Sequence, residues 1–160
     1  MKKPKTKTGL LVAVAKDVLN LIDYMNIRDR KGYMFWRRKA CDPASYRKNL
    51  DKINEYEGDS RAIQENIPKI AKACEVCARG AMFLAHTHLY DGIDSLYDAN
   101  NLADEESAKL FGAVGYDIEC AFENPQDPIL RKLKPKARLK AIMLQVIRQR
   151  GKFKENIPKC

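Results

Sequence analysis

Residues 73–89 read ACEVCARGAMFLAHTHL, and we expect this segment to form the core helix of the domain. At 100° per residue, one stripe of a helix here carries small or apolar side chains and one histidine: Ala73, Cys77, Gly80, Ala81, Leu84 and His88. Met82 and Phe83 lie on the flanks and far side, so the helix is apolar around most of its circumference. Such a helix belongs inside a domain. We expect small residues such as Gly80 to allow close packing against a helix near the N-terminus.

The flanking sequence predicts a mainly α fold with five or six helices and at most one small β element. Apolar side chains recur at helical spacing over residues 10–27, 45–56, 104–122 and 135–150. Pro135 suits a first helical turn, and Gly151 is expected to end the last helix. Residues 33–36 form an aromatic run typical of a strand, and the two prolines of residues 124–128 predict a loop.

A chain of 160 residues predicts a single compact domain. We place it at residues 9–151, after a disordered basic arm (residues 1–8) and before a basic C-terminal tail (residues 152–160). The chain has an odd number of cysteines, no secretory apolar segment and no apolar run of roughly 18 residues. These features predict reduced thiols in a cytoplasmic protein that does not enter a membrane.

The net charge of +9 is concentrated at the C-terminal end. Residues 131–160 hold eleven Lys or Arg and one acid, Glu155, whereas the other 130 residues hold 19 bases and 20 acids. A concentrated positive charge favours an acidic partner, with nucleic acid first. The alternative is that the bases of residues 131–160 serve only to keep the protein soluble.

Five short motifs stand out along the chain: AKDVL at residues 15–19, GY at 32–33, CEVCARGA at 74–81, RLKAIM at 138–143 and GKF at 151–153. Together they resemble a family of small uncharacterised proteins from bacteria and their phages. The resemblance covers most of the chain. It implies a shared fold and a phage or mobile-element origin, and because the family has no assigned activity it implies no catalytic residues.

The CxxC pair Cys74 and Cys77 has four interpretations: a zinc site, a catalytic thiol, a redox pair or core packing. On a continuous helix Cys77 and His88 would lie about 16 Å apart, whereas zinc ligands lie about 2.3 Å from the ion. His86 would point away from Cys77, towards solvent, and His88 would be a hydrogen-bonded core residue. Core packing is therefore favoured, and we predict no metal, no cofactor and no catalytic residue.

Two basic clusters are the candidate binding residues. Tyr33 and Trp36 could stack on bases beside Arg37, Arg38 and Lys39, although the same pattern suits an edge strand that packs on the core. The C-terminal candidates are Lys132, Lys134, Arg138, Lys140, Arg148, Lys152 and Lys154. We expect Arg138, Lys140 and Arg148 to lie on three different non-core sides of the last helix, which favours diffuse contact with phosphates over base recognition.

The sequence thus favours a non-enzymatic binding or regulatory protein that engages nucleic acid or a nucleoprotein complex, such as a defence-related one. An acidic protein surface is the other partner considered, and no oligomeric state is predicted. The rival hypothesis is a small enzyme or nucleotide-binding protein with a pocket against the helix of residues 74–89. A polar cleft lined by Cys77, Tyr33 and carboxylates would favour the rival, whereas a packed core with a positive outer face would favour binding.

Overall fold

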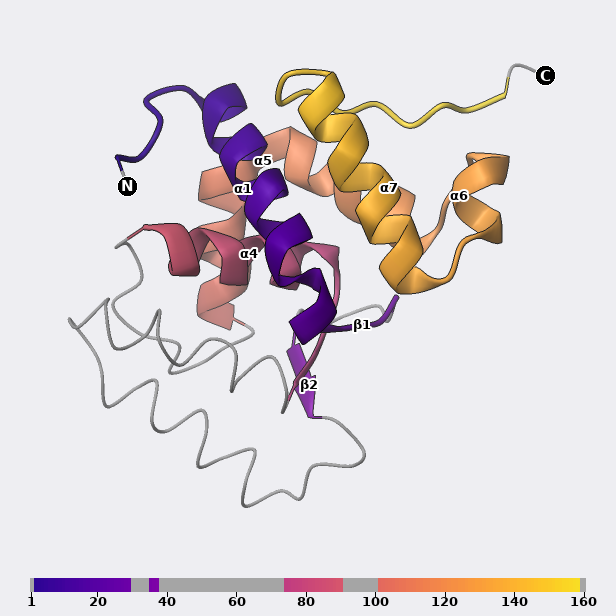
Figure 1. Ribbon diagram of the computed structural model, residues 1–160, viewed down its shortest axis with the longest axis horizontal. Helices are drawn as coiled ribbons and strands as arrows, with labels where there is room; N and C mark the ends of the chain where they lie inside the picture. Colours follow the sequence, from indigo (N-terminus) through magenta and orange to yellow (C-terminus); the bar gives the residue numbers. More distant parts are fainter. Residues whose placement is uncertain (1, 30–34, 38–73, 91–100, 159–160) are drawn as a thin grey trace.

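A computed structural model describes residues 2–29, 35–37, 74–90 and 101–158 (Figure 1). Within these ranges the chain is mainly α-helical with one small sheet, which confirms the predicted fold class. The elements in chain order are α1 (Lys7–Leu21), the 3₁₀ turn η1 (Ile22–Tyr24), β1 (Asn26–Ile27), β2 (Phe35–Arg37), β3 (Cys74–Val76), α4 (Ala78–Leu89), α5 (Asn101–Glu123), α6 (Pro128–Lys132) and α7 (Pro135–Arg148). The helix predicted over residues 45–56 lies outside the described residues. Of the described helices, none combines the length and the apolar character needed to cross a bilayer.

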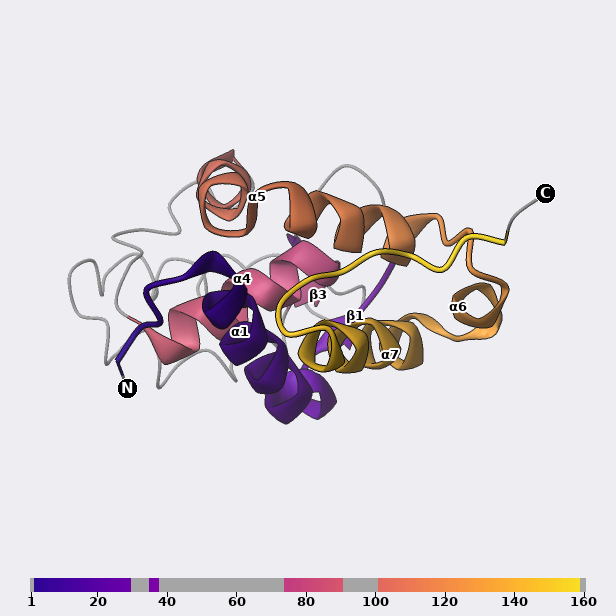
Figure 2. The same ribbon diagram turned by 90° about the horizontal axis from the view of Figure 1, so that it is seen from above.

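Helix α4 is the centre of the molecule. It lies between α1 on one side and α5 on the other, and α7 packs beside α1 (Figures 1 and 2). Its side chains are buried both on the side that faces α1 and on the side that faces α5, as expected for a helix that is apolar around most of its circumference. The buried set on α4 is Ala78, Ala81, Met82, Phe83, Leu84, Ala85 and His86.

The start of the stretch at residues 73–89 is not helical, and this corrects the prediction. Cys74–Val76 is β3, the central strand of a three-stranded sheet with the order β1-β3-β2. It pairs parallel to β1 through Asn26 and Glu75, and antiparallel to β2 through Phe35 and Val76. Cys77 then has an extended backbone and caps α4, because its Sγ accepts a hydrogen bond from the Gly80 amide at 3.5 Å. The small β element is therefore larger than the aromatic run suggested.

The first helix is shifted towards the N-terminus relative to the prediction. Thr6 caps α1 by accepting a hydrogen bond from the Gly9 amide at 3.1 Å, so the helix includes Lys7 and Thr8. It ends at Leu21, and the chain continues through η1 into β1. Ile22 and Met25 are buried as their apolar character demands, but from a 3₁₀ turn and an extended residue rather than an α-helix.

Two local features modify the second half of the chain. Helix α5 is interrupted at Gly112, whose φ of 56° and ψ of −144° are not helical. The short helix α6 occupies part of the region that the prolines predicted to be a loop. Pro128 stands in its first turn, where no amide hydrogen is required, and the Asp127 side chain accepts a hydrogen bond from the Ile129 amide at 2.8 Å.

The C-terminal segment is attached to the domain. Helix α7 has Pro135 in its first turn, and Gly151 follows its end with a φ of 88°, as predicted. Residues 152–158 then turn back past α7 towards α6 (Figure 2). Phe153 is buried, and the Glu155 carboxylate accepts hydrogen bonds from the backbone amides of Gln126 and Asp127.

Candidate functional site

The predicted binding residues divide into three groups. Tyr33, Arg38 and Lys39 lie outside the described residues, as do the side chains of Trp36 and Arg37, whose backbones form β2. One of the C-terminal candidates, Arg138, is buried. The remaining candidates have exposed side chains: Lys132, Lys134, Lys140, Arg148, Lys152 and Lys154.

Arg138 is a structural residue, and the prediction that it lies on a non-core side of α7 is wrong. Its residue exposure is 7%, and its guanidinium donates hydrogen bonds to three backbone carbonyls, those of Phe122 at 2.6 Å and of Leu130 and Leu133 at 3.0 Å each. It also pairs with Asp29 at 3.2 Å and lies over the Phe122 ring. Because these contacts join α5, α6 and α7, the guanidinium is not available to a phosphate.

The exposed cations of α7 share one side of the helix. Lys136, Lys140 and Arg148 fall within an arc of about 120° at 100° per residue, with the exposed Leu144 between them. We call these three cations the basic face. Along the helix axis, Lys136 and Lys140 are about 6 Å apart, and Lys140 and Arg148 about 12 Å. The sequence prediction spread the α7 cations over three sides because it did not identify Arg138 as buried.

More exposed cations lie on α6, at the start of α7 and after its end. Together the exposed bases form what we call the basic segment: Arg131, Lys132, Lys134, Lys136, Lys140, Arg148, Arg150, Lys152 and Lys154. In the part of the chain that the structure describes, no carboxylate forms an ion pair with any of them. The two acids that flank the segment in sequence are engaged elsewhere, Asp127 as the cap of α6 and Glu155 with backbone amides. Its positive charge is therefore uncompensated locally.

Cys77 has the properties of a core residue. It is fully buried, and this burial raises the pKa of its thiol to about 12, so the thiolate that a nucleophile or a metal ligand requires is strongly disfavoured. Its Sγ and carboxylate oxygens of Glu119 and Glu123 lie within 4.8 Å of one another, a grouping that could hold a metal ion. Arg79, however, already pairs with Glu119 at 2.8 Å. A metal ion would have to displace that arginine and deprotonate a buried thiol.

The two histidines are placed differently from the prediction. His86, expected to face solvent, is 1% exposed, because α5 covers its side of α4. Among the described residues neither ring nitrogen has a hydrogen-bond partner, and the ring meets Tyr90 and Phe111 edge-on. Burial lowers the pKa of His86 to about 4, so the imidazole is neutral at pH 7. His88 is hydrogen-bonded as predicted, but its side chain is 37% exposed.

The partner of His88 is Asp17 of α1, at 2.8 Å between Nδ1 and Oδ2. Asp17 is buried, although a carboxylate is usually exposed. The spacing in the sequence does indicate this burial. Asp17 follows Leu10 by seven residues and Val14 by three, which places it close to the apolar side of the helix that these two residues share. A carboxylate there requires a partner from another element, and His88 supplies it.

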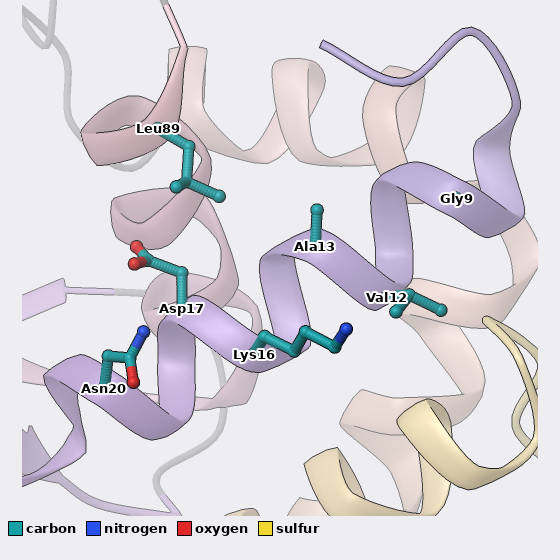
Figure 3. A pocket seen from close by; sticks show the side chains of 7 residues that line it. All are labelled: Gly9, Val12, Ala13, Lys16, Asp17, Asn20 and Leu89. Atoms are coloured by element: carbon teal, nitrogen blue, oxygen red, sulfur yellow. The ribbon is translucent and has the colours of Figure 1, made fainter. Parts of the chain in front are cut away.

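A groove of about 480 Å³ opens beside this pair, between α1 and the C-terminal end of α4 (Figure 3). Most of its described lining comes from one side of α1, and α4 contributes Leu89. The lining residues are Gly9, Val12, Ala13, Lys16, Asp17, Asn20 and Leu89. Cys77 does not line it, because that residue is buried at the other end of α4.

Comparison of the chain with protein families, with curated proteins and with solved structures found no match.

Proposed function

We propose that this protein binds nucleic acid, free or within a nucleoprotein complex, through the basic segment. The observation that carries the proposal is the set of nine exposed cations for which the described residues supply no ion pair. Cations that serve only to balance nearby acids would be paired. Unpaired cations in this number instead create a positive potential that attracts a polyanion.

The arrangement on α7 favours contact with phosphates rather than with bases. The basic face is a row of long, flexible side chains, and helices α6 and α7 contain no acid that would repel a phosphate backbone. Helix α7 also begins without a side-chain cap and without an acid in its first turn, while Lys134 and Lys136 flank that end. The positive end of the helix dipole adds to their charge. Contacts of this kind position a duplex without reading its sequence.

The features that would support an enzyme are weaker. Cys77 is a protonated core residue, and the described lining of the groove beside α4 includes no Ser, Thr, Cys, His or Tyr. A regulatory or anti-defence role, a phage origin and a cytoplasmic location remain part of the proposal, but their support is the sequence resemblance and the cysteine content rather than the geometry. The binding experiment below distinguishes nucleic acid from an acidic protein as the partner.

The test compares two triple variants with the same loss of charge. One removes the basic face (Lys136→Gln, Lys140→Gln and Arg148→Gln), and the control removes three exposed cations of the N-terminal region (Lys2→Gln, Lys5→Gln and Lys7→Gln). Fluorescence anisotropy with a labelled DNA duplex at low salt measures the affinity. We expect the basic-face variant to lose at least about tenfold in affinity and the control much less, because only the former removes phosphate contacts.

Two results would contradict the proposal. If the wild-type protein binds neither DNA nor RNA at low salt, the nucleic-acid partner is wrong, and an acidic protein becomes the better candidate. If both triple variants weaken binding equally, net charge rather than the basic segment determines the affinity.

A further inference from the structure

We infer that the groove between α1 and the end of α4 binds a nucleoside monophosphate, with the base near Asp17 and Asn20 and the phosphate near Lys16. The groove and the basic face use different cations, so this inference does not depend on the proposed nucleic-acid binding.

The groove has the size and the walls of a small-ligand site. Its volume of about 480 Å³ lies within the range of roughly 300–1,000 Å³ typical of such sites. Val12, Ala13 and Leu89 supply apolar surface, and in Figure 3 the side chains of Ala13 and Leu89 point into the space between the two helices. A flat heteroaromatic ring can bury its faces against such walls.

One end of the groove carries groups that can hydrogen-bond the edge of a base. The Asp17 carboxylate is held by His88 through Oδ2, and among the described residues its other oxygen, Oδ1, has no partner. Asn20, one helical turn further along α1, offers a carboxamide that both donates and accepts. A carboxylate accepts hydrogen bonds from exocyclic amino groups of bases, and a carboxamide can complement a neighbouring donor or acceptor. This end therefore suits a nucleobase rather than an aliphatic ligand.

The described lining of the groove also includes one cationic side chain. Lys16 is exposed and has no ion-pair partner among the described residues, and in Figure 3 its side chain extends from beside Asp17 towards Val12. Gly9 marks the far end and belongs to the first turn of α1, where the helix dipole is positive. A phosphate joined to the base through a sugar would meet this charge. Inorganic phosphate would leave the apolar walls unused, and a neutral nucleoside would leave Lys16 unused.

The test is isothermal titration calorimetry with AMP, GMP, CMP and UMP and with the four corresponding nucleosides. We expect at least one nucleotide to bind with 1:1 stoichiometry and its nucleoside to bind more weakly. Lys16→Gln should weaken the nucleotide by about tenfold and leave the nucleoside unchanged, since it removes a charged contact to the phosphate. Asn20→Leu should weaken both. Both residues are exposed, so neither substitution removes a core contact.

Lys140→Gln tests the other candidate position for the nucleotide, because it removes an exposed lysine of the basic face and none of the groove. The inference is wrong if none of the four nucleotides binds at millimolar concentration. It is also wrong if Lys140→Gln weakens the nucleotide while Lys16→Gln does not, since the nucleotide would then occupy the basic face. Equal weakening of nucleotide and nucleoside by Lys16→Gln would contradict the assignment of the phosphate.

Discussion

Gly151 and Thr8 meet backbone to backbone. A Cβ atom on Gly151 would lie 2.1 Å from the carbonyl oxygen of Thr8, and the φ of Gly151 is 88°. The turn that ends α7 is thereby fitted against the first turn of α1, at a distance that a side chain would prevent. This contact joins the two ends of the described chain and sets the direction in which residues 152–158 leave α7.

Gly151→Ala should therefore destabilise the protein by about 2–4 kcal/mol, since the methyl group meets a backbone oxygen and the residue keeps a positive φ. The measurement is the free energy of unfolding in urea. Gln149→Ala, at an exposed position of the same turn, serves as the control and should change it by less than about 0.5 kcal/mol. Equal stabilities of the two variants would show that the contact with Thr8 is not formed.

Stability should fall in mild acid because of His86. Its folded-state pKa is lowered to about 4 from an ordinary value of 6.5, so between these values the unfolded chain binds the proton more readily than the folded protein. Above pH 6.5 this difference in pKa contributes up to about 3 kcal/mol to the free energy of unfolding, and the contribution is lost as the pH falls towards 4. His86→Leu should remove this part of the pH dependence when unfolding is measured across that window. A profile identical to that of the wild-type protein would contradict the burial of a neutral imidazole.

The thiols should differ sharply in reactivity. Cys77 is buried with a pKa of about 12, whereas Cys120 is exposed on α5. A maleimide reagent followed by peptide mass spectrometry should modify Cys120 first and Cys77 only after unfolding, because the thiolate is the reacting species. Labelling of both cysteines at similar rates in the native protein would contradict the position of Cys77 beneath α5.

Arg138 should matter for stability and not for nucleic-acid binding. Arg138→Gln leaves three carbonyl oxygens and Asp29 without their partner, and we expect a loss of about 2–4 kcal/mol. Lys140→Gln, two residues later and exposed, should leave the free energy of unfolding nearly unchanged but weaken the affinity for DNA. Corrected for the folded fraction, the affinity of Arg138→Gln should stay close to that of the wild-type protein. If Arg138→Gln instead left the free energy of unfolding unchanged and weakened the affinity for DNA, Arg138 would belong to the binding surface.

Local signals made α7 and the core position of α4 predictable from the sequence. Pro135 and Gly151 bound α7 by their own backbone preferences, and the apolar run after Cys77 has few positions suited to solvent. The strand at Cys74–Val76 was not predictable in this way, because its partners lie about 40 to 50 residues earlier in the chain. A sequence window contains no record of such pairing.

The site was predicted less well for a related reason. Asp17, His86 and Arg138 are polar residues whose burial depends on partners or covering helices from other elements. Their residue types predict exposure on average. The overall excess of charge at the C-terminal end was readable from composition alone, whereas the one-sided face on α7 became clear only once Arg138 was assigned to the interior.

We propose that the basic segment binds the phosphates of nucleic acid, and the salt dependence of duplex binding is the sharpest test of this proposal. Each phosphate contact releases a counterion, so four to six contacts predict that log affinity falls with log salt at a slope of about −3.6 to −5.4. Changing Lys132, Lys134, Arg148, Lys152 and Lys154 to glutamine should flatten that slope and leave the melting temperature nearly unchanged, since all five side chains are exposed. A slope that is the same in this variant as in the wild-type protein would contradict the claim.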